Sequence, residues 1–230
     1  MIPSNKPAWI ITDIEGTTTD VSFVFNVLFP YFRENLKDWA NVSSEELDAI
    51  LIAAQTIVQQ EEGTTKLSRQ DLLDKLFQWS LEDRKVTPLK ELQGLVWKKG
   101  FESGELKGHV YPDVLPALNY WKSIQIQLAV FSSGSVSAQK QLFGNSVEGD
   151  LTSYFRHFFD THTGPKREAT TYLRMAELLC SPPGGILFLS DVKEELEAAQ
   201  QAGYQTIQLL RPGTKNAWPR HVLDFSQITY

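Results

Sequence analysis

The amino-acid sequence predicts an α/β fold, in which a parallel β-sheet is covered by helices on both faces and interrupted by an inserted helical domain. Two observations support this prediction. Short apolar runs rich in β-branched and aromatic residues alternate with helical patterns in the second half of the chain. A long segment nearer the N-terminus shows the helical pattern alone. We therefore expect a three-layer core domain in residues 1–20 and 106–230 and a helical domain in residues 21–105.

Four short apolar runs are typical of buried parallel strands, because each is only a few residues long and ends in small or polar residues. These runs are residues 9–12, 126–131, 186–189 and 206–210. A weaker fifth candidate, residues 157–159, ends on Asp160. Helical patterns occupy the intervals around the later runs, at residues 113–121, 136–143, 168–179 and 193–202. Strands that alternate with helices at this spacing favour a parallel sheet with both faces covered.

The segment between Asp20 and Lys107 shows no convincing strand and reads as consecutive amphipathic helices. Three local signals indicate where helices begin. They are the capping-box pairs Ser43 with Glu46 and Ser68 with Asp71, and Thr87 as an N-cap followed by Pro88. Each signal precedes apolar residues at helical spacing, so this segment is predicted to be a separate helical domain.

Composition and charge narrow the classes of function. Hydrophobic residues make up 42% of the chain and charged residues 22%, which is typical of a globular protein. The formal net charge of -6 and the lack of dense Lys/Arg clusters argue against binding to nucleic acid or to an anionic membrane. A small molecule is the expected partner.

Two further features bear on the compartment. Residues 1–9 lack a hydrophobic run of signal-peptide length, and the apolar stretches elsewhere are too short to cross a bilayer. Cys180 is the single cysteine, which excludes an intrachain disulfide, and we expect its side chain to be a small buried apolar group. The sequence thus favours a soluble cytoplasmic protein.

Polar residues follow the predicted strands at the edge where open parallel sheets bind ligands. A loop lysine just before a helix can reach the same edge. The candidates are Asp13, Glu15, Ser132, Ser133, Lys166 and Asp191. Each residue type also has a simpler role, since an acid can form a turn, a serine can cap the next helix and a loop lysine can be solvated. Their order along the chain is the more specific signal.

That order, an acid with a second acid two positions on, then a hydroxyl, a lysine and an acid, resembles the four signatures of the haloacid dehalogenase superfamily. The flanking segments are similar to those of one family within it, enolase-phosphatase E1. They are DIEGTTT at residues 13–19, LFPY at 28–31, GELKGHVYPD at 104–113, SSGS at 132–135 and LSDV at 189–192. The resemblance implies a Rossmann-like core with a helical cap inserted after the first signature.

The resemblance also implies a catalytic or binding role for each candidate. Asp13 is expected to attack phosphorus as a nucleophile, and Glu15 to act as a general acid and then as a base. Ser132 or Ser133, together with Lys166, is expected to bind the phosphoryl oxygens, where negative charge develops in the transition state.

A divalent cation is required at such a site because the carboxylates and the phosphate repel one another. Two unit charges about 4 Å apart repel by roughly 4 kcal/mol at an effective dielectric constant of about 20. Ligands that are all oxygen favour Mg²⁺, whereas zinc favours His or Cys. The resemblance implies one Mg²⁺ per chain, bound by the Asp13 and Asp191 side chains and the Glu15 backbone carbonyl. Glu195, one helical turn after Asp191, is expected to support the metal through water, and Gly16 to let the backbone approach the phosphate.

The resemblance to the E1 family implies a bifunctional acireductone synthase of methionine salvage, and a monomer is expected. Such an enzyme enolises 5-(methylthio)-2,3-dioxopentyl phosphate and dephosphorylates it, through an aspartyl-phosphate, to 1,2-dihydroxy-5-(methylthio)pent-1-en-3-one. Two alternatives stay open. One is another capped, Mg²⁺-dependent phosphatase or phosphomutase of the superfamily that acts on a small phosphorylated metabolite. The other is a non-catalytic phosphate-binding module, in which the nucleophile or the lysine would be missing.

Overall fold

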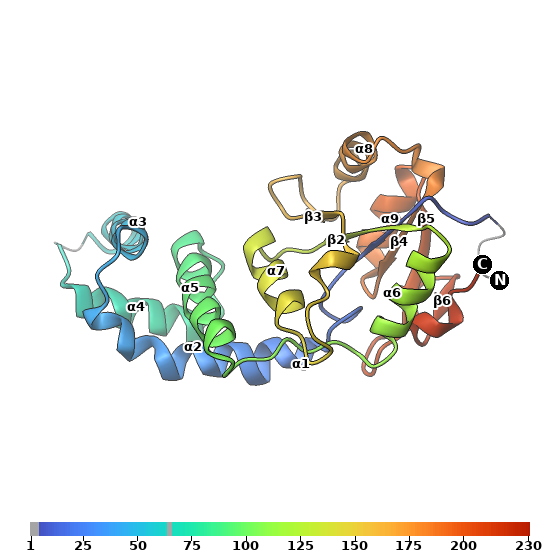
Figure 1. The fold of residues 1–230 in the computed structure, drawn as a ribbon. Helices are drawn as coiled ribbons and strands as arrows, with labels where there is room; N and C mark the ends of the chain where they lie inside the picture. The colour runs from blue at the N-terminus through green and yellow to red at the C-terminus, as the bar shows by residue number, and fades with distance from the viewer. Residues whose placement is uncertain (1–4, 64–65) are drawn as a thin grey trace. The chain divides into compact units, whose positions relative to one another are not determined.

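A computed structural model describes residues 5–63 and 66–230 of the chain. The chain divides into two compact units. The α/β unit comprises Met1–Val21 and Lys107–Tyr230, and the helical unit comprises Ser22–Leu106. In Figure 1 the labelled strands all belong to the first unit, and the segment coloured from blue to green forms the helices of the second.

The α/β unit is built on a six-stranded, all-parallel sheet with the order β3-β2-β1-β4-β5-β6. Its strands are β1 (Trp9–Thr12), β2 (Gln127–Phe131), β3 (His157–Phe159), β4 (Ile186–Ser190), β5 (Gln205–Leu209) and β6 (His221–Val222). Thr12, the last residue of β1, pairs with Val130 on one side and Leu189 on the other. The segments after β1, β2 and β4 therefore leave the sheet at the same edge.

This topology confirms the predicted α/β fold with a parallel sheet. The five predicted strands are all present, and their observed bounds differ from the predicted ones by at most one residue at either end. Strand β6 was not predicted, because two residues are too short to show a pattern. It is defined by its pairing with β5, which places Gln208 opposite His221 and Leu209 opposite Val222.

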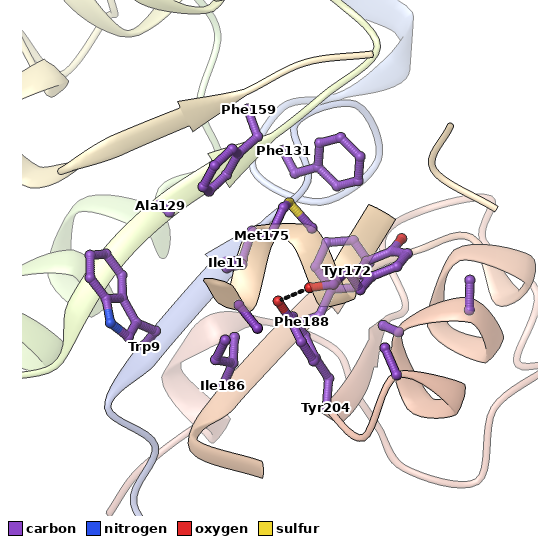
Figure 2. Packing of buried hydrophobic residues seen from close by; sticks show 14 of the residues in the cluster. Trp9, Ile11, Ala129, Phe131, Phe159, Tyr172, Met175, Ile186, Phe188 and Tyr204 are labelled. Carbon is purple, nitrogen blue, oxygen red and sulfur yellow. Dashed lines mark hydrogen bonds between the residues drawn. The ribbon is translucent and has the colours of Figure 1, made fainter. Parts of the chain in front are cut away.

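Helices pack on both faces of this sheet. They are α6 (Val114–Ser123), α7 (Val136–Gly144), α8 (Ala169–Leu178) and α9 (Lys193–Gln201). On one face, Trp9 and Ile11 of β1 cluster with side chains of α8 and α9, and Tyr172 of α8 accepts a hydrogen bond on its carbonyl from the Tyr204 hydroxyl, 2.7 Å away (Figure 2). Successive strand residues point to opposite faces, so Ile10 is buried on the other side, where α6 contacts β2 and α7 contacts β3.

The helical unit contains no strand among its described residues. Its elements are α1 (Val21–Phe23, which begins in the α/β unit), the π-helix η1 (Val24–Leu28), α2 (Phe29–Asn35), the 3₁₀ helix η2 (Leu36–Asn41), α3 (Glu45–Glu62), α4 (Arg69–Leu81) and α5 (Thr87–Ser103). Buried side chains of these helices, among them Phe32, Leu76 and Trp79, form a separate hydrophobic core. None of the helices in the described part of the chain is long and apolar enough to span a membrane.

One of the three predicted helix starts in this unit is confirmed. Ser68 and Asp71 form the expected capping box at the start of α4. The cap of α3 is Ser44 rather than Ser43, because the hydroxyl of Ser44 accepts the hydrogen bond of a first-turn amide. Thr87 is already the first residue of α5, whose N-cap residue provides no side-chain hydrogen bond. In a pair of adjacent serines, the backbone geometry of the turn decides which one caps the helix.

The expectation that Cys180 is buried is wrong. The side chain is exposed, and the residue adopts a left-handed backbone conformation with φ of +49°. Its backbone N–H donates to the carbonyl of Glu177, at 3.0 Å, directly after the end of α8. The chain turns away from the helix at this point, and the side chain is directed outward.

Candidate active site

Three side chains form a buried ion-pair network at the carboxyl edge of the sheet. Asp13 follows β1, Lys166 precedes α8, and Glu195 lies in the first turn of α9. Lys166 Nζ is 2.7 Å from Asp13 Oδ1 and 2.9 Å from Glu195 Oε2, and the side chains of Asp13, Lys166 and Glu195 are 3%, 8% and 9% exposed. Burial lowers the pKa of Lys166, but the charges of Asp13 and Glu195 outweigh burial and raise it above its ordinary value. Lys166 is therefore a fixed positive charge.

The carboxylate of Asp13 is held in one orientation. The backbone N–H of Asp13 donates to the carbonyl of Leu189 in β4, at 2.9 Å. Its Oδ1 accepts hydrogen bonds from the backbone N–H of Ile14, at 2.7 Å, and from Lys166. Its Oδ2 has a longer contact, 3.5 Å, with the hydroxyl of Ser190. The two carboxylate oxygens are thus distinct, and Oδ2 is the less engaged one.

Glu15 follows Asp13 by two residues, and its side chain contacts the segment after β2. Ser132 donates its hydroxyl to Glu15 Oε2 across 3.4 Å. Burial raises the pKa of Glu15, and the negative charge of Asp13 raises it further. Among the described contacts, the hydrogen bond to this acid comes from Ser132, whereas Ser133 is exposed. Neither serine caps the next helix, since that role belongs to Ser135.

Asp191 follows β4 and packs against the turn after Asp13. Its backbone N–H donates to the hydroxyl of Thr17, at 3.1 Å. Gly16 has φ of +74°, and a Cβ at this position would lie only 2.4 Å from Asp191 Oδ2. We predicted that Gly16 lets the backbone approach a phosphate; in the structure the close neighbour is the carboxylate of Asp191. Burial raises the pKa of Asp191 to about 6, with a second contribution from the charge of Asp13.

Two further residues of this region were not assigned a role from the sequence. Ser190 donates its hydroxyl to Glu195 Oε2, at 3.0 Å, and accepts a hydrogen bond from the backbone of Val192, at 3.0 Å. Thr17 holds the backbone of Asp191. Both residues lie inside the motif segments at 13–19 and 189–192, so their proximity to acids was the available signal. The contact of Thr17 with Asp191 joins segments 174 residues apart and could not be read locally, whereas those of Ser190 with Glu195 and Val192 lie within five residues of it.

The predicted Mg²⁺ site can be compared with the oxygen atoms that the structure places at this edge of the sheet. No group of three or more His, Cys, Asp or Glu side chains within residues 5–63 and 66–230 could hold a metal ion. Mg²⁺ does not need one, because it commonly takes one or two carboxylates and completes its octahedron with water and substrate phosphate. Asp191 Oδ1 is buried and accepts no hydrogen bond from the described residues, which is unfavourable without a cation. The carboxylates of Asp13 and Asp191 therefore fit Mg²⁺, and the backbone carbonyl of Glu15 stays an expected ligand.

The sheet and the acids at its carboxyl edge define a class of hydrolase. A family model described as haloacid dehalogenase-like hydrolase matches residues 8–203. The crystal structure of a dehalogenase that is 17% identical to this chain has the same fold, with a TM-score of 0.58 over 99% of this chain and 97% of that one. The chain belongs to the haloacid dehalogenase-like hydrolases.

More similar relatives define the family within this class. Enolase-phosphatase E1 of Picosynechococcus sp. is 54% identical over 224 residues, which cover 96% of this chain and 97% of that protein. Enolase-phosphatase E1 of Pseudomonas aeruginosa is 51% identical over 220 residues, or 95% and 96% of the two chains. The Unknown transcript 4 protein of Saccharomyces cerevisiae is 30% identical in sequence to this chain. Its crystal structure matches with a TM-score of 0.80 over 96% of this chain and 100% of that one. The chain is a member of the enolase-phosphatase E1 family, as its motifs predicted.

Proposed function

We propose that this protein is an acireductone synthase that enolises 5-(methylthio)-2,3-dioxopentyl phosphate and then removes its phosphate. The most direct support is sequence similarity. Over 95–96% of its length, this chain is 51–54% identical to proteins named enolase-phosphatase E1. The buried arrangement of Asp13 and Lys166 beside Asp191 supplies the groups that a phosphoryl transfer needs. The name of these relatives, enolase-phosphatase, specifies both halves of the reaction, the enolase step and the phosphatase step.

In the proposed phosphatase step, the carboxylate of Asp13 attacks phosphorus and the P–O bond to the substrate breaks. The leaving oxygen takes a proton from Glu15, whose pKa is raised by burial, a shift that favours the protonated form a general acid needs. The aspartyl-phosphate on Asp13 is then attacked at phosphorus by water, which gives up a proton to Glu15. Phosphate leaves, and both carboxyl groups return to their starting states. One difficult displacement is thereby divided into two easier ones.

Positive charge and hydrogen-bond donors stabilise the transferring group. Lys166 stays protonated and already lies 2.7 Å from the nucleophile, so its ammonium group can also contact a phosphoryl oxygen. The hydroxyl of Ser132 donates to Glu15, and rotation of this side chain could direct the hydroxyl to the phosphate instead. Ser133 is exposed, and its part in phosphate binding is a weaker component of the proposal.

Mg²⁺, one per chain, is the proposed cofactor and would offset the charge between the carboxylates and the phosphate. Asp13 and Asp191 would hold it with their side chains and Glu15 with its backbone carbonyl. Glu195 is proposed to support this site through water, although its contacts in the structure are with Lys166 and Ser190. A monomeric enzyme is part of this proposal.

The enolase step removes a proton from carbon and leaves negative charge on a carbonyl oxygen. A protonated lysine in a buried site stabilises such an oxygen, and Lys166 is proposed to do so. The helical unit, Ser22–Leu106, is proposed to serve as the cap domain that excludes water during transfer.

The test is turnover of the diketo-phosphate with Mg²⁺, in which ultraviolet absorbance of the enediol product and release of phosphate are recorded together. We expect both signals, with phosphate release abolished by chelation of the metal. Release of phosphate from another sugar phosphate, without turnover of the diketo-phosphate, would overturn the substrate assignment but not the proposed phosphatase chemistry. Return of the phosphoryl group to a product would indicate a phosphomutase.

A further inference from the structure

Arg211 is a buried cation that the reaction described above does not use. It lies just after β5 and is 5% exposed. Its Nη1 and Nη2 donate to the two oxygens of Asp113, at 2.9 and 2.8 Å, in a bidentate pair. The rings of Tyr111 and Phe225 lie 4.1 and 5.2 Å from its guanidinium carbon. The guanidinium group is therefore held at one edge by the Asp113 carboxylate and packs against two aromatic rings.

The remaining nitrogen of this guanidinium is directed at the turn after the nucleophile. Arg211 Nε donates to the backbone carbonyl of Thr17, at 2.9 Å. Thr17 is fully buried, and its hydroxyl accepts the hydrogen bond of the Asp191 backbone, at 3.1 Å. One residue thus receives Arg211 on its carbonyl and holds Asp191 with its side chain.

The turn from Gly16 to Thr19 is held by further hydrogen bonds. The backbone N–H of Gly16 donates to the carbonyl of Thr19, at 2.8 Å, and the N–H of Tyr111 donates to the carbonyl of Thr18, at 2.9 Å. A Cβ on Gly16 would lie 2.4 Å from the carboxylate of Asp191. A displacement of this turn would therefore move the carboxylate of Asp191.

We propose that Arg211 is a positioning residue for the metal site, acting through Thr17 to fix Asp191 at the distance from Asp13 that the cation requires. The inference rests on the proposed Mg²⁺ site. Metal sites depend on the groups behind their ligands, and loss of such a group typically weakens metal binding by about 10–100-fold. Lysine is a poor substitute here, because a single ammonium cannot bind both oxygens of Asp113 and the Thr17 carbonyl in one plane.

A purely structural role is the competing explanation. Asp113 also accepts a hydrogen bond from the backbone N–H of Phe225, at 2.7 Å, so the Arg211–Asp113 pair helps hold the C-terminal segment as well. A structural role would lower stability and leave metal affinity unchanged in the folded protein. A positioning role changes metal affinity in protein that remains folded.

The experiment measures binding of Mn²⁺, as a paramagnetic substitute for Mg²⁺, to the full-length protein by electron paramagnetic resonance, with thermal unfolding as a check of folding. We expect Arg211→Lys to weaken Mn²⁺ binding by about 10-fold. Thr17→Val removes the hydroxyl that holds Asp191 and should weaken binding similarly, whereas Thr17→Ser, which keeps it, should bind as wild type does. In the double variant Arg211→Lys with Thr17→Val, the loss should be smaller than the sum of the two.

Arg69 offers a matched control in the helical unit. It also donates to a carboxylate, Asp48 at 3.1 Å, and to a backbone carbonyl, that of Val42 at 2.6 Å. Arg69→Lys should leave Mn²⁺ affinity unchanged. If Arg211→Lys does not fold, Asp113→Asn, which loosens the bidentate pair, takes its place with the same expected direction.

The outcomes separate this inference from the proposed function. Failure of the wild-type protein to bind Mn²⁺, or unchanged binding in Asp191→Asn, would reject the proposed metal site itself. If wild type binds and Asp191→Asn does not, unchanged affinity in folded Arg211→Lys or Asp113→Asn would overturn the positioning role. Fully additive losses in the double variant would also overturn it, because Arg211 would then act by a route other than Thr17.

Discussion

Charged side chains are distributed differently in the two units of this protein. In the α/β unit, Asp13, Lys166, Glu195 and Arg211 are all less than a tenth exposed. In the helical unit, the buried polar residues among those described are the uncharged Ser80 and Gln93, and the ion pairs lie at the surface. Burying charge is unfavourable for stability unless every group is compensated. The difference supports the proposal that the α/β unit carries the reactive site, while the helical unit is stabilised by its apolar core.

The largest effect is expected from the proposed nucleophile, Asp13. Asp13→Asn should reduce phosphate release by at least about 10³-fold, because an amide cannot form the aspartyl-phosphate. Asp48→Asn, at a carboxylate that is 53% exposed in the helical unit, should stay within about twofold of wild type. The measurement is steady-state phosphate release at saturating substrate. Comparable activity of the two variants would remove the functional contrast between the units.

The next effect concerns stability. Lys166→Met leaves Asp13 and Glu195 as buried acids without their cation, and we expect a loss of about 3–5 kcal/mol in the free energy of unfolding. Lys75→Met, which removes a half-exposed partner of Glu62, should lose only about 0–1 kcal/mol. Urea denaturation of both variants gives the comparison. Equal losses would mean that burial does not distinguish the two ion pairs.

The stability of the protein should depend on pH because the pKa of Asp191 is raised. Its pKa is raised from 3.8 to about 6, so its contribution to stability in metal-free protein is fully present below about pH 4 and is lost as pH rises through about 6. Mg²⁺ binds the ionised carboxylate and should restore stability above that range. At about 100 times its Kd, the ion should raise Tm by about 5–10 °C at pH 8 and by less at pH 5. Differential scanning fluorimetry of wild type and Asp191→Asn tests this, since the variant should lose the difference.

The smallest of these effects compares two glycines in similar backbone conformations. Gly16 and Gly63 have φ of +74° and +64°, so the backbone strain of alanine at either should cost about 1–2 kcal/mol of stability. A Cβ on Gly16 meets the carboxylate of Asp191, whereas a Cβ on Gly63 meets nothing within 4 Å. Gly16→Ala should therefore also weaken Mg²⁺ binding by about 10–100-fold, measured by calorimetry. An equal effect of Gly63→Ala would show that the loss comes from backbone strain alone.

The parallel sheet was predictable because its signals are local. Each run of apolar residues, such as residues 186–189, is short, and the polar residue that ends it marks the functional edge. Register was not predictable, since the pairing of Thr12 with Val130 and Leu189 depends on how distant segments pack. Strand β6 was missed because two residues show no pattern, and the outward side chain of Cys180 because it depends on the turn after α8.

By itself the sequence determined the order of Asp13, Glu15, Ser132 and Asp191 after apolar runs and of Lys166 in the loop before a helix. Through that order it determined the chemistry to expect. The contacts among them were decided by the tertiary structure.

Arg211 shows the limit most clearly, because it reaches Asp113 across 98 residues and Thr17 across 194. Nothing in the neighbourhood of any one of these residues requires the other two. Hydrogen bonds between distant segments exist only once the sheet has brought them together, so they leave no periodic or spacing signal in the chain.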